Sequence, residues 1–153
     1  EDWLGRGMAA VALGELGQPE AVPALIRAGR FGDTRDAAIR ALAALGDPRA
    51  AALMVTALTP ATDADTAEAA REALRDLGQD AVPALIAALR ELPEAGDEPA
   101  ASCASLLGEV GGADAAGALQ DALDDPRAEV RNAAAAALAG IQTRGGADGA
   151  SAS

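Results

Sequence analysis

Side chains that could do chemistry are few in this chain, and their spacing suits structure better than catalysis. The 153 residues contain no His and no Tyr, so the usual general base and the phenolic acid are both missing. Cys103 is the single cysteine, which excludes an intramolecular disulfide and a cysteine-based metal cluster. It falls on the apolar side of an expected helix, where a free thiol behaves as a small hydrophobe. We therefore expect no catalytic residue.

Carboxylates are plentiful, but most of them stand where helices are expected to begin or where turns are exposed. These are Asp33, Asp47, Asp63, Asp65, Asp80, Asp97 and Asp125. Asp63 with Asp65 and Asp124 with Asp125 form close pairs, and neither has the spacing of a calcium-binding loop. The glycine-rich stretch 108–112 follows a helix rather than a strand, which predicts a turn and not a phosphate cradle. We predict no metal site and no cofactor.

The charge of the chain disfavours several classes of partner. Asp and Glu number 24 against 12 basic residues, all of them Arg, so the net charge is −12. Such a field repels nucleic acid and anionic membranes, and Trp3 and Phe31 are the only aromatic residues that could stack on bases. It favours basic partners, although solubility explains the same charge more simply. With no signal-peptide pattern and no apolar run that could span a bilayer, we expect a cytoplasmic location. The chain begins at Glu1 rather than Met, which leaves open a longer native chain.

The spacing of apolar residues predicts an internal repeat. The last apolar residue of a Leu-rich helix end recurs in steps of 29, 32, 33 and 31 residues, at Leu16, Leu45, Leu77, Val110 and Ile141. A nearly constant period of this length without strand signals is typical of a two-helix solenoid. Because Ala is the best helix former, the Ala-rich, Leu-punctuated composition agrees with this. We predict an all-α fold, a right-handed α-solenoid of about four helix pairs plus a C-terminal helix.

The repeat divides the chain into units of two helices each. The predicted units are about residues 3–31, 32–60, 61–93 and 94–124, with a half unit at 125–143. Residues 1–143 form the repeat domain in this prediction, and the tail at 144–153 is predicted to be disordered because it has no periodic apolar residues.

Capping residues mark the predicted helix ends. A glycine that follows the last apolar residue of a first helix is expected in the left-handed conformation, at Gly17, Gly46, Gly78 and Gly111. Asp47 and Asp125 each stand before a proline, an arrangement typical of a helix start. Asp65 with Glu68 resembles a capping box.

The predicted core stripe of a second helix follows an i, i+3, i+4, i+7 spacing. In the third unit it consists of Val82, Leu85, Ile86 and Leu89, and in the fourth of Leu119 and Leu123.

Two stretches resemble a known repeat family. Residues 125–138, Asp-Pro-Arg-Ala-Glu-Val-Arg-Asn followed by Ala and Leu, resemble the first helix of a HEAT-like repeat of the phycobilisome-lyase type. The run Leu-Gly-Gln-Asp-Ala-Val-Pro-Ala-Leu-Ile at 77–86 resembles its junction and second helix, and the resemblance covers about residues 3–141. In the family an arginine packs against an acid of a neighbouring repeat, which the resemblance implies for Arg131 and Arg35. It leaves function open, because such repeats occur in scaffolds, regulatory appendages, tetrapyrrole lyase subunits and some nucleic-acid enzymes.

The surface of the second helices is where the sequence predicts the functional residues. Alignment of these helices gives two rows of surface positions, Arg27, Thr56, Ala87 and Asp121 in one and Arg30, Thr59, Arg90 and Asp124 in the other. In HEAT-like solenoids the second helices line the concave side, so the resemblance implies a groove that is basic towards the N-terminus and acidic towards the C-terminus. A solvated charged face without function is the competing interpretation.

We predict a non-catalytic protein-protein interaction or scaffold module that binds a protein or peptide of the opposite polarity on this face. The predicted partner-binding residues are Arg27, Arg30, Thr56, Thr59, Arg90, Asp121 and Asp124. The alternative is a subunit or regulatory domain of an enzyme system such as a tetrapyrrole (bilin) lyase.

Overall fold

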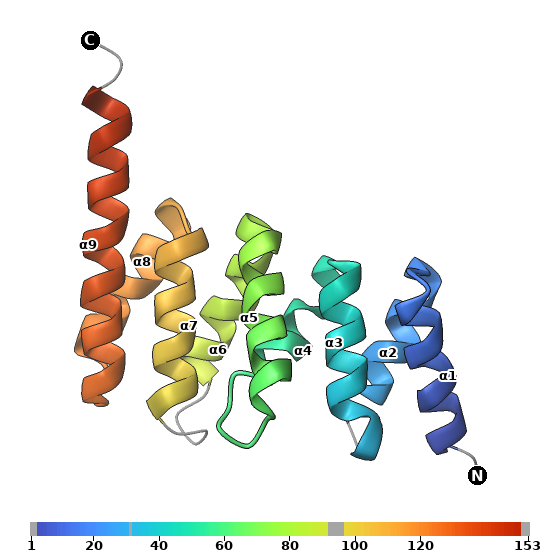
Figure 1. Cartoon of the computed structure of the whole chain (residues 1–153). Helices are drawn as coiled ribbons and strands as arrows, with labels where there is room; N and C mark the ends of the chain where they lie inside the picture. The colour runs from blue at the N-terminus through green and yellow to red at the C-terminus, as the bar shows by residue number, and fades with distance from the viewer. Residues whose placement is uncertain (1–2, 31, 92–96, 151–153) are drawn as a thin grey trace. The chain divides into compact units, whose positions relative to one another are not determined.

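The computed structural model describes residues 3–30, 32–91 and 97–150, and every regular element in these ranges is helical (Figure 1). The first helices of the repeats are α1 (Trp3–Glu15), α3 (Arg35–Leu45), α5 (Ala64–Leu77), α7 (Asp97–Val110) and α9 (Ala128–Ala150). The second helices are α2 (Val22–Ala28), α4 (Ala51–Val55), α6 (Val82–Glu91) and α8 (Ala113–Asp121). Short 3₁₀ helices adjoin them, namely η1 (Pro19–Ala21), η2 (Gly32–Thr34), η3 (Pro48–Ala50), η4 (Gly78–Ala81) and η5 (Ala122–Asp124). The predicted all-α solenoid of two-helix repeats is confirmed.

The chain forms two compact units, Glu1–Asp80 and Ala81–Ser153, called unit 1 and unit 2 below. The predicted repeat at 61–93 is divided between them, because α5 belongs to unit 1 and α6 to unit 2. The right-handed superhelix stays a prediction.

Unit 1 is built from the stacking of first helices. Helix α3 contacts α1 on one side and α5 on the other, and α2 lies against both α1 and α3 (Figure 1). The apolar residues at helical spacing are fully buried between these helices, as Val22, Leu25, Ile39, Leu42, Met54 and Leu74. The apolar stripe of each helix is too wide for one partner helix to cover, so the stacking of neighbouring pairs buries it.

Arg35 at the start of α3 holds the turn that precedes α5. Arg35 Nη2 donates to the carbonyl oxygen of Thr56 at 2.9 Å, and its Nη1 donates to Thr62 Oγ1 at 3.2 Å. The acid beside Arg35 is Asp36 of its own helix, at 3.3 Å. The implied pairing of Arg35 with an acid of a neighbouring repeat is therefore wrong; the guanidinium crosses to a carbonyl and a hydroxyl instead.

Arg131 corrects the same expectation in unit 2. Its Nη1 donates to the carbonyl oxygens of Asp125 and Pro126, both at 2.8 Å. These carbonyls belong to the turn that leads into α9, so Arg131 closes the start of its own helix rather than reaching an acid of another repeat.

The predicted left-handed cap is confirmed at Gly46, and Gly17 also has a positive φ. Gly78 combines a positive φ with a ψ of −122°, outside the left-handed helical region, and the prediction for Gly111 is wrong. The backbone φ is +73° at Gly17, +63° at Gly46 and +57° at Gly78. Gly111 has no positive φ, and a Cβ there would lie 2.0 Å from the Cβ of Ala115. Gly111 is needed for this close approach between the end of α7 and the start of α8, not for a left-handed turn.

The aspartate cap predicted at Asp47 is confirmed, and the one predicted at Asp65 is shifted by two residues. Asp47 accepts a hydrogen bond from the backbone N–H of Arg49 at 2.9 Å, as predicted for a helix start. At the start of α5 the cap is Asp63 and not Asp65, because Asp63 Oδ1 accepts from the N–H groups of Asp65 and Thr66, each at 3.1 Å. The side-chain hydroxyl of Thr66 and then its backbone N–H hold the pKa of Asp63 below its usual value.

Unit 2 packs α7 against α9, with α6 against α7 and α8 against α9 (Figure 1). Its fully buried side chains include Leu85, Cys103, Leu106, Leu107, Leu119 and Val130. Two predicted core positions differ, since Leu123 is 40% exposed and Ile86 is half-buried.

Helix α9 is longer than the sequence predicted. It continues through residues 144–150, which were expected to be disordered, while residues 151–153 of that predicted tail lie outside the described residues. The side chain of Arg144 reaches back to the carbonyl oxygen of Gly108 in α7. The helix therefore continues past this contact through several glycines, although each costs about 1 kcal/mol relative to Ala.

Candidate functional site

Unit 2 carries a groove between its two second helices, called here the α6–α8 groove. It consists of two adjoining hollows that share Arg90. The first has a volume of about 500 Å³ and is lined by Val82, Pro83, Ile86, Ala87, Arg90 and Asp114. The second has about 310 Å³ and extends past the ends of α6 and α8 to the turn before α9.

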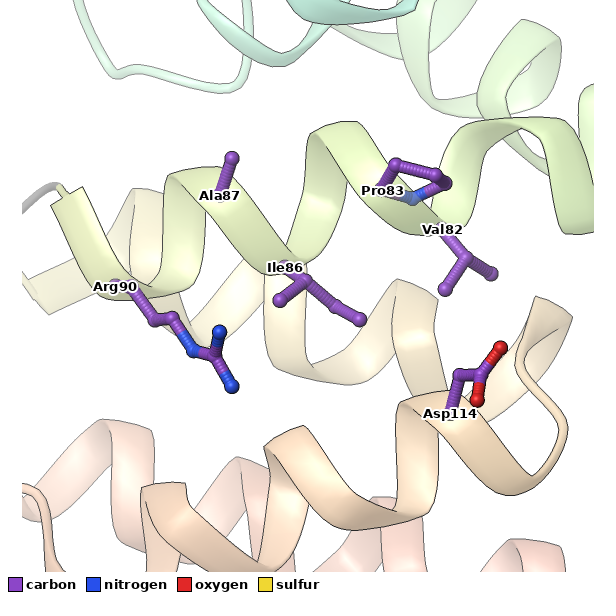
Figure 2. A pocket seen from close by; sticks show the side chains of 6 residues that line it. All are labelled: Val82, Pro83, Ile86, Ala87, Arg90 and Asp114. Atoms are coloured by element: carbon purple, nitrogen blue, oxygen red, sulfur yellow. The ribbon is translucent and has the colours of Figure 1, made fainter.

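The helical period places the lining side chains on facing stripes. Val82, Ile86 and Arg90 are four residues apart on α6 and point towards α8 in Figure 2, while Pro83 and Ala87 point away from it. Asp114 lies on α8 opposite the Val82 end of the hollow, and Arg90 lies at the other end (Figure 2). The floor is therefore apolar, and charges of opposite sign stand at its two ends.

A weak ion pair crosses the groove. Arg90 Nη2 lies 3.5 Å from Asp121 Oδ2, and the two side chains are 63% and 75% exposed. Exposed pairs of this kind contribute about 0–1 kcal/mol, because water and salt screen them and ordering two long side chains costs entropy. A ligand can therefore replace this pair at little cost.

The wall of the second hollow is rigid by comparison. Arg127 Nε and Nη2 donate to Asp125 Oδ1 and Oδ2, each at 2.8 Å, and the two side chains are only 14% and 15% exposed. The backbone N–H of Arg127 also donates to Asp125 Oδ1 at 2.9 Å. The hydrogen bonds from the Arg127 side chain hold the pKa of Asp125 below its usual value. Such a forked pair is satisfied internally and leaves little charge for a ligand.

Asp125→Asn should lower the free energy of unfolding by about 1 kcal/mol at neutral pH, because Asn keeps a capping oxygen but loses the charge that Arg127 binds. The folded-state pKa of Asp125 is lowered, so its contribution is present above the ordinary carboxyl pKa of about 3.9 and is lost as the pH falls through the folded value. Urea titrations across acidic pH should show the wild-type advantage disappear in that range. Asp47→Asn is the matched control, since Arg49 in the same arrangement is 58% exposed and should give a smaller effect.

Comparison with known proteins identifies the repeat. The family described as HEAT repeats matches residues 1–75, and the PBS lyase HEAT-like repeat matches residues 67–91. The chain is a HEAT-like repeat protein. No curated protein matches it significantly.

A solved structure also resembles this HEAT-like repeat protein. It is the complex of CpcE and CpcF of phycocyanin lyase from Nostoc sp. PCC7120, with 29% sequence identity and a TM-score of 0.49. The match covers 94% of this chain and 61% of that one, so the HEAT-like repeat protein spans less than two thirds of the length of that chain.

The structure brings together two of the predicted partner-binding residues of the HEAT-like repeats. Arg90 and Asp121, assigned to different rows by the alignment, face each other across the α6–α8 groove. Asp124 is exposed in η5, beside this groove in sequence but not among its lining residues. Arg27 and Arg30 are exposed at the end of α2 in unit 1, and their role stays a prediction.

The two predicted threonines serve the turn after α4. Thr56 Oγ1 donates to the carbonyl oxygen of Leu53 at 2.6 Å. Thr59 Oγ1 lies 3.3 Å from Thr62 Oγ1, which also accepts from Arg35. These hydroxyl groups stabilise the connection to α5, and nothing in their geometry assigns them to a partner.

Sequence reasoning missed Asp114 and Ile86 as groove residues. Asp114 stands seven residues before Asp121, so the two fall on one side of α8, and this spacing was a usable signal. Ile86 was taken as core because its apolar type and spacing match those of buried residues. Only the structure shows that α8 leaves it half-exposed.

The described parts of the chain also bear on three other features, namely a reactive cysteine, a metal site and a membrane-spanning helix. Cys103 is fully buried, and desolvation raises the pKa of its thiol to about 12, as expected for a structural cysteine. Residues 3–30, 32–91 and 97–150 hold no group of three or more His, Cys, Asp or Glu that could bind a metal ion. Across the same ranges, none of the helices is both long enough and apolar enough to cross a membrane.

Proposed function

We propose that this HEAT-like repeat protein is a non-catalytic interaction module and that a segment of a partner protein binds in the α6–α8 groove. The observation that carries the proposal is the pair of adjoining hollows on the second helices, with an apolar floor between charged ends. A floor of this kind accepts apolar side chains, and the charges at its rim fix their register.

The size of the hollows suits a peptide segment. An apolar side chain of Leu size gains about 1.5–3 kcal/mol when it is fully buried. Ile86, which is half-buried, offers such a surface beside the buried Val82, and both side chains line the first hollow. A few anchors of this kind, ringed by polar contacts, supply most of the binding energy in protein interfaces.

The chemistry of the chain also favours binding over catalysis. The single thiol is buried and its raised pKa keeps it protonated at neutral pH, so it does not act as a nucleophile. The Asp125–Arg127 fork is closed on itself. The carboxylates at the groove, Asp114 and Asp121, are exposed to solvent.

Ile86→Lys should abolish selection of peptides at this groove, because the added charge lies on the apolar floor. A phage-displayed dodecapeptide library would be panned on the full chain and on the variant. Leu123→Lys is the matched control, since Leu123 is exposed in the same unit but lines neither hollow. Peptides that bind the wild type and the control but not Ile86→Lys support the proposal, provided that circular dichroism shows equal helix content. If no peptide depends on Ile86, the groove is not a binding site.

A second proposal is a subunit or regulatory domain of an enzyme system such as a bilin lyase. The match of residues 67–91 to the PBS lyase HEAT-like repeat supports it. Visible absorbance after addition of bilin separates the two proposals, since an interaction module that binds only protein leaves the free pigment spectrum unchanged.

A further inference from the structure

The geometry points to a basic segment as the occupant of the α6–α8 groove, with a Lys or Arg on either side of an apolar residue. This inference rests on the proposed function and names the chemistry of its partner. It is carried by the charges that remain uncompensated along the groove and by the distance between them.

The charges of the groove do not balance. The Asp125–Arg127 fork is neutral, which leaves Arg90 against Asp114 and Asp121. Arg90 forms an ion pair with Asp121, while no cation among the described residues pairs with Asp114. The net charge of −12 on the chain adds to this negative field. An acidic segment would meet repulsion at Asp114, whereas a basic one is attracted there and by the net negative charge of the groove.

The spacing of the two acids sets the spacing of the partner's basic residues. Asp114 and Asp121 are seven residues apart on α8, which is about 10 Å along the helix axis at 1.5 Å per residue. A segment in the polyproline II conformation rises about 3.1 Å per residue with three residues per turn, so residues three apart lie on one face and roughly match this distance. Val82 lies opposite Asp114, and Ile86 lies between Val82 and Arg90 (Figure 2). Arg90 in turn pairs with Asp121. An apolar residue between the two basic ones therefore meets the floor.

Arg90 competes with the partner's second basic residue for Asp121. Its contact with Asp121 is long and exposed, so an incoming Lys or Arg can take its place. The displaced guanidinium would still repel the new cation. Removal of the charge at Arg90 should therefore tighten binding, which is the opposite of what a direct contact with the partner would give.

The test uses peptides selected on the full chain that fail to bind Ile86→Lys. Their sequences are read, and fluorescein-labelled copies are titrated by fluorescence anisotropy. We expect Lys or Arg on both sides of an apolar residue. Asp114→Asn and Asp121→Asn should each weaken binding about two- to fivefold, Arg90→Gln should tighten it by a similar factor, and added salt should weaken it. Asp76→Asn makes the same change in net charge at an exposed position of unit 1 and should have no effect.

The two levels of the proposal fail in different ways. Peptides that depend on Ile86 but lack basic residues, or that bind Asp114→Asn and Asp121→Asn as tightly as the wild type, overturn the basic partner and leave the interaction module standing. An equal loss with Asp76→Asn also overturns it, because the effect would then come from net charge rather than from the groove. Absence of any Ile86-dependent peptide overturns the proposed function itself.

Discussion

Leu25→Ala should lower the free energy of unfolding by about 2–5 kcal/mol, the largest effect expected in unit 1. Leu25 is fully buried in α2, and its side chain lies directly against Gly14 of α1, where an added Cβ would be 2.8 Å from Leu25 Cδ1. The substitution removes the buried methyl groups and leaves a cavity that the closely packed helices can close only in part. Urea denaturation followed by circular dichroism measures the change.

Leu16→Ala provides the comparison for this prediction. The same atoms are removed, but Leu16 is 72% exposed at the end of α1, so its unfolding free energy should change by no more than about 0.5 kcal/mol. A similar loss for both variants would contradict the assignment of Leu25 to the core.

Gly108→Ala should destabilise unit 2 by about 1–3 kcal/mol, although Ala is the better helix former. Gly108 lies in the last turn of α7, against Ala137 of α9. A Cβ at this position would lie 2.5 Å from the Cβ and 2.8 Å from the Cα of Ala137. The second of these atoms belongs to the backbone, so the overlap is relieved only if the two helices move apart.

Gly117→Ala tests the same substitution where space is available. Gly117 is exposed within α8, and nothing lies within 4 Å of an added Cβ. This variant should gain about 0.5–1 kcal/mol, because Ala loses less backbone entropy on folding. Opposite signs for the two variants in the same denaturation experiment confirm that close approach, and not helix propensity, requires glycine at 108. A gain for Gly108→Ala would show that α7 and α9 do not pack this closely.

Local features of this protein were predictable from the sequence. Asp47 and Asp125 cap helix starts as expected, because a cap depends on a side chain and an N–H group only two residues away. Gly46 takes a positive φ for a similarly local reason, since it follows the last turn of α3. The repeat period predicted the helix pairs, because a period of about 30 residues without strand signals is typical of two helices per repeat.

Features that depend on contacts between distant residues were missed. Gly111 had the same sequence context as Gly46, but Ala115 of the next helix determines its role. The tail at 144–150 lacks apolar periodicity, yet the contact from Arg144 to Gly108 of α7 extends α9. Leu123 fits the apolar spacing of its helix, but the packing of the neighbouring helices leaves it 40% exposed.

The candidate site shows the same division. Composition and repeat pattern by themselves determined an all-α repeat chain with a buried cysteine and its variable charges on the second helices. Only the tertiary structure decided which of these charges meet, by placing Arg90 opposite Asp121 and Asp114 opposite the Val82 end of the hollow that Ile86 also lines. The reason is physical: helical spacing fixes the face on which a side chain lies, whereas the distance between two helices depends on every residue packed between them.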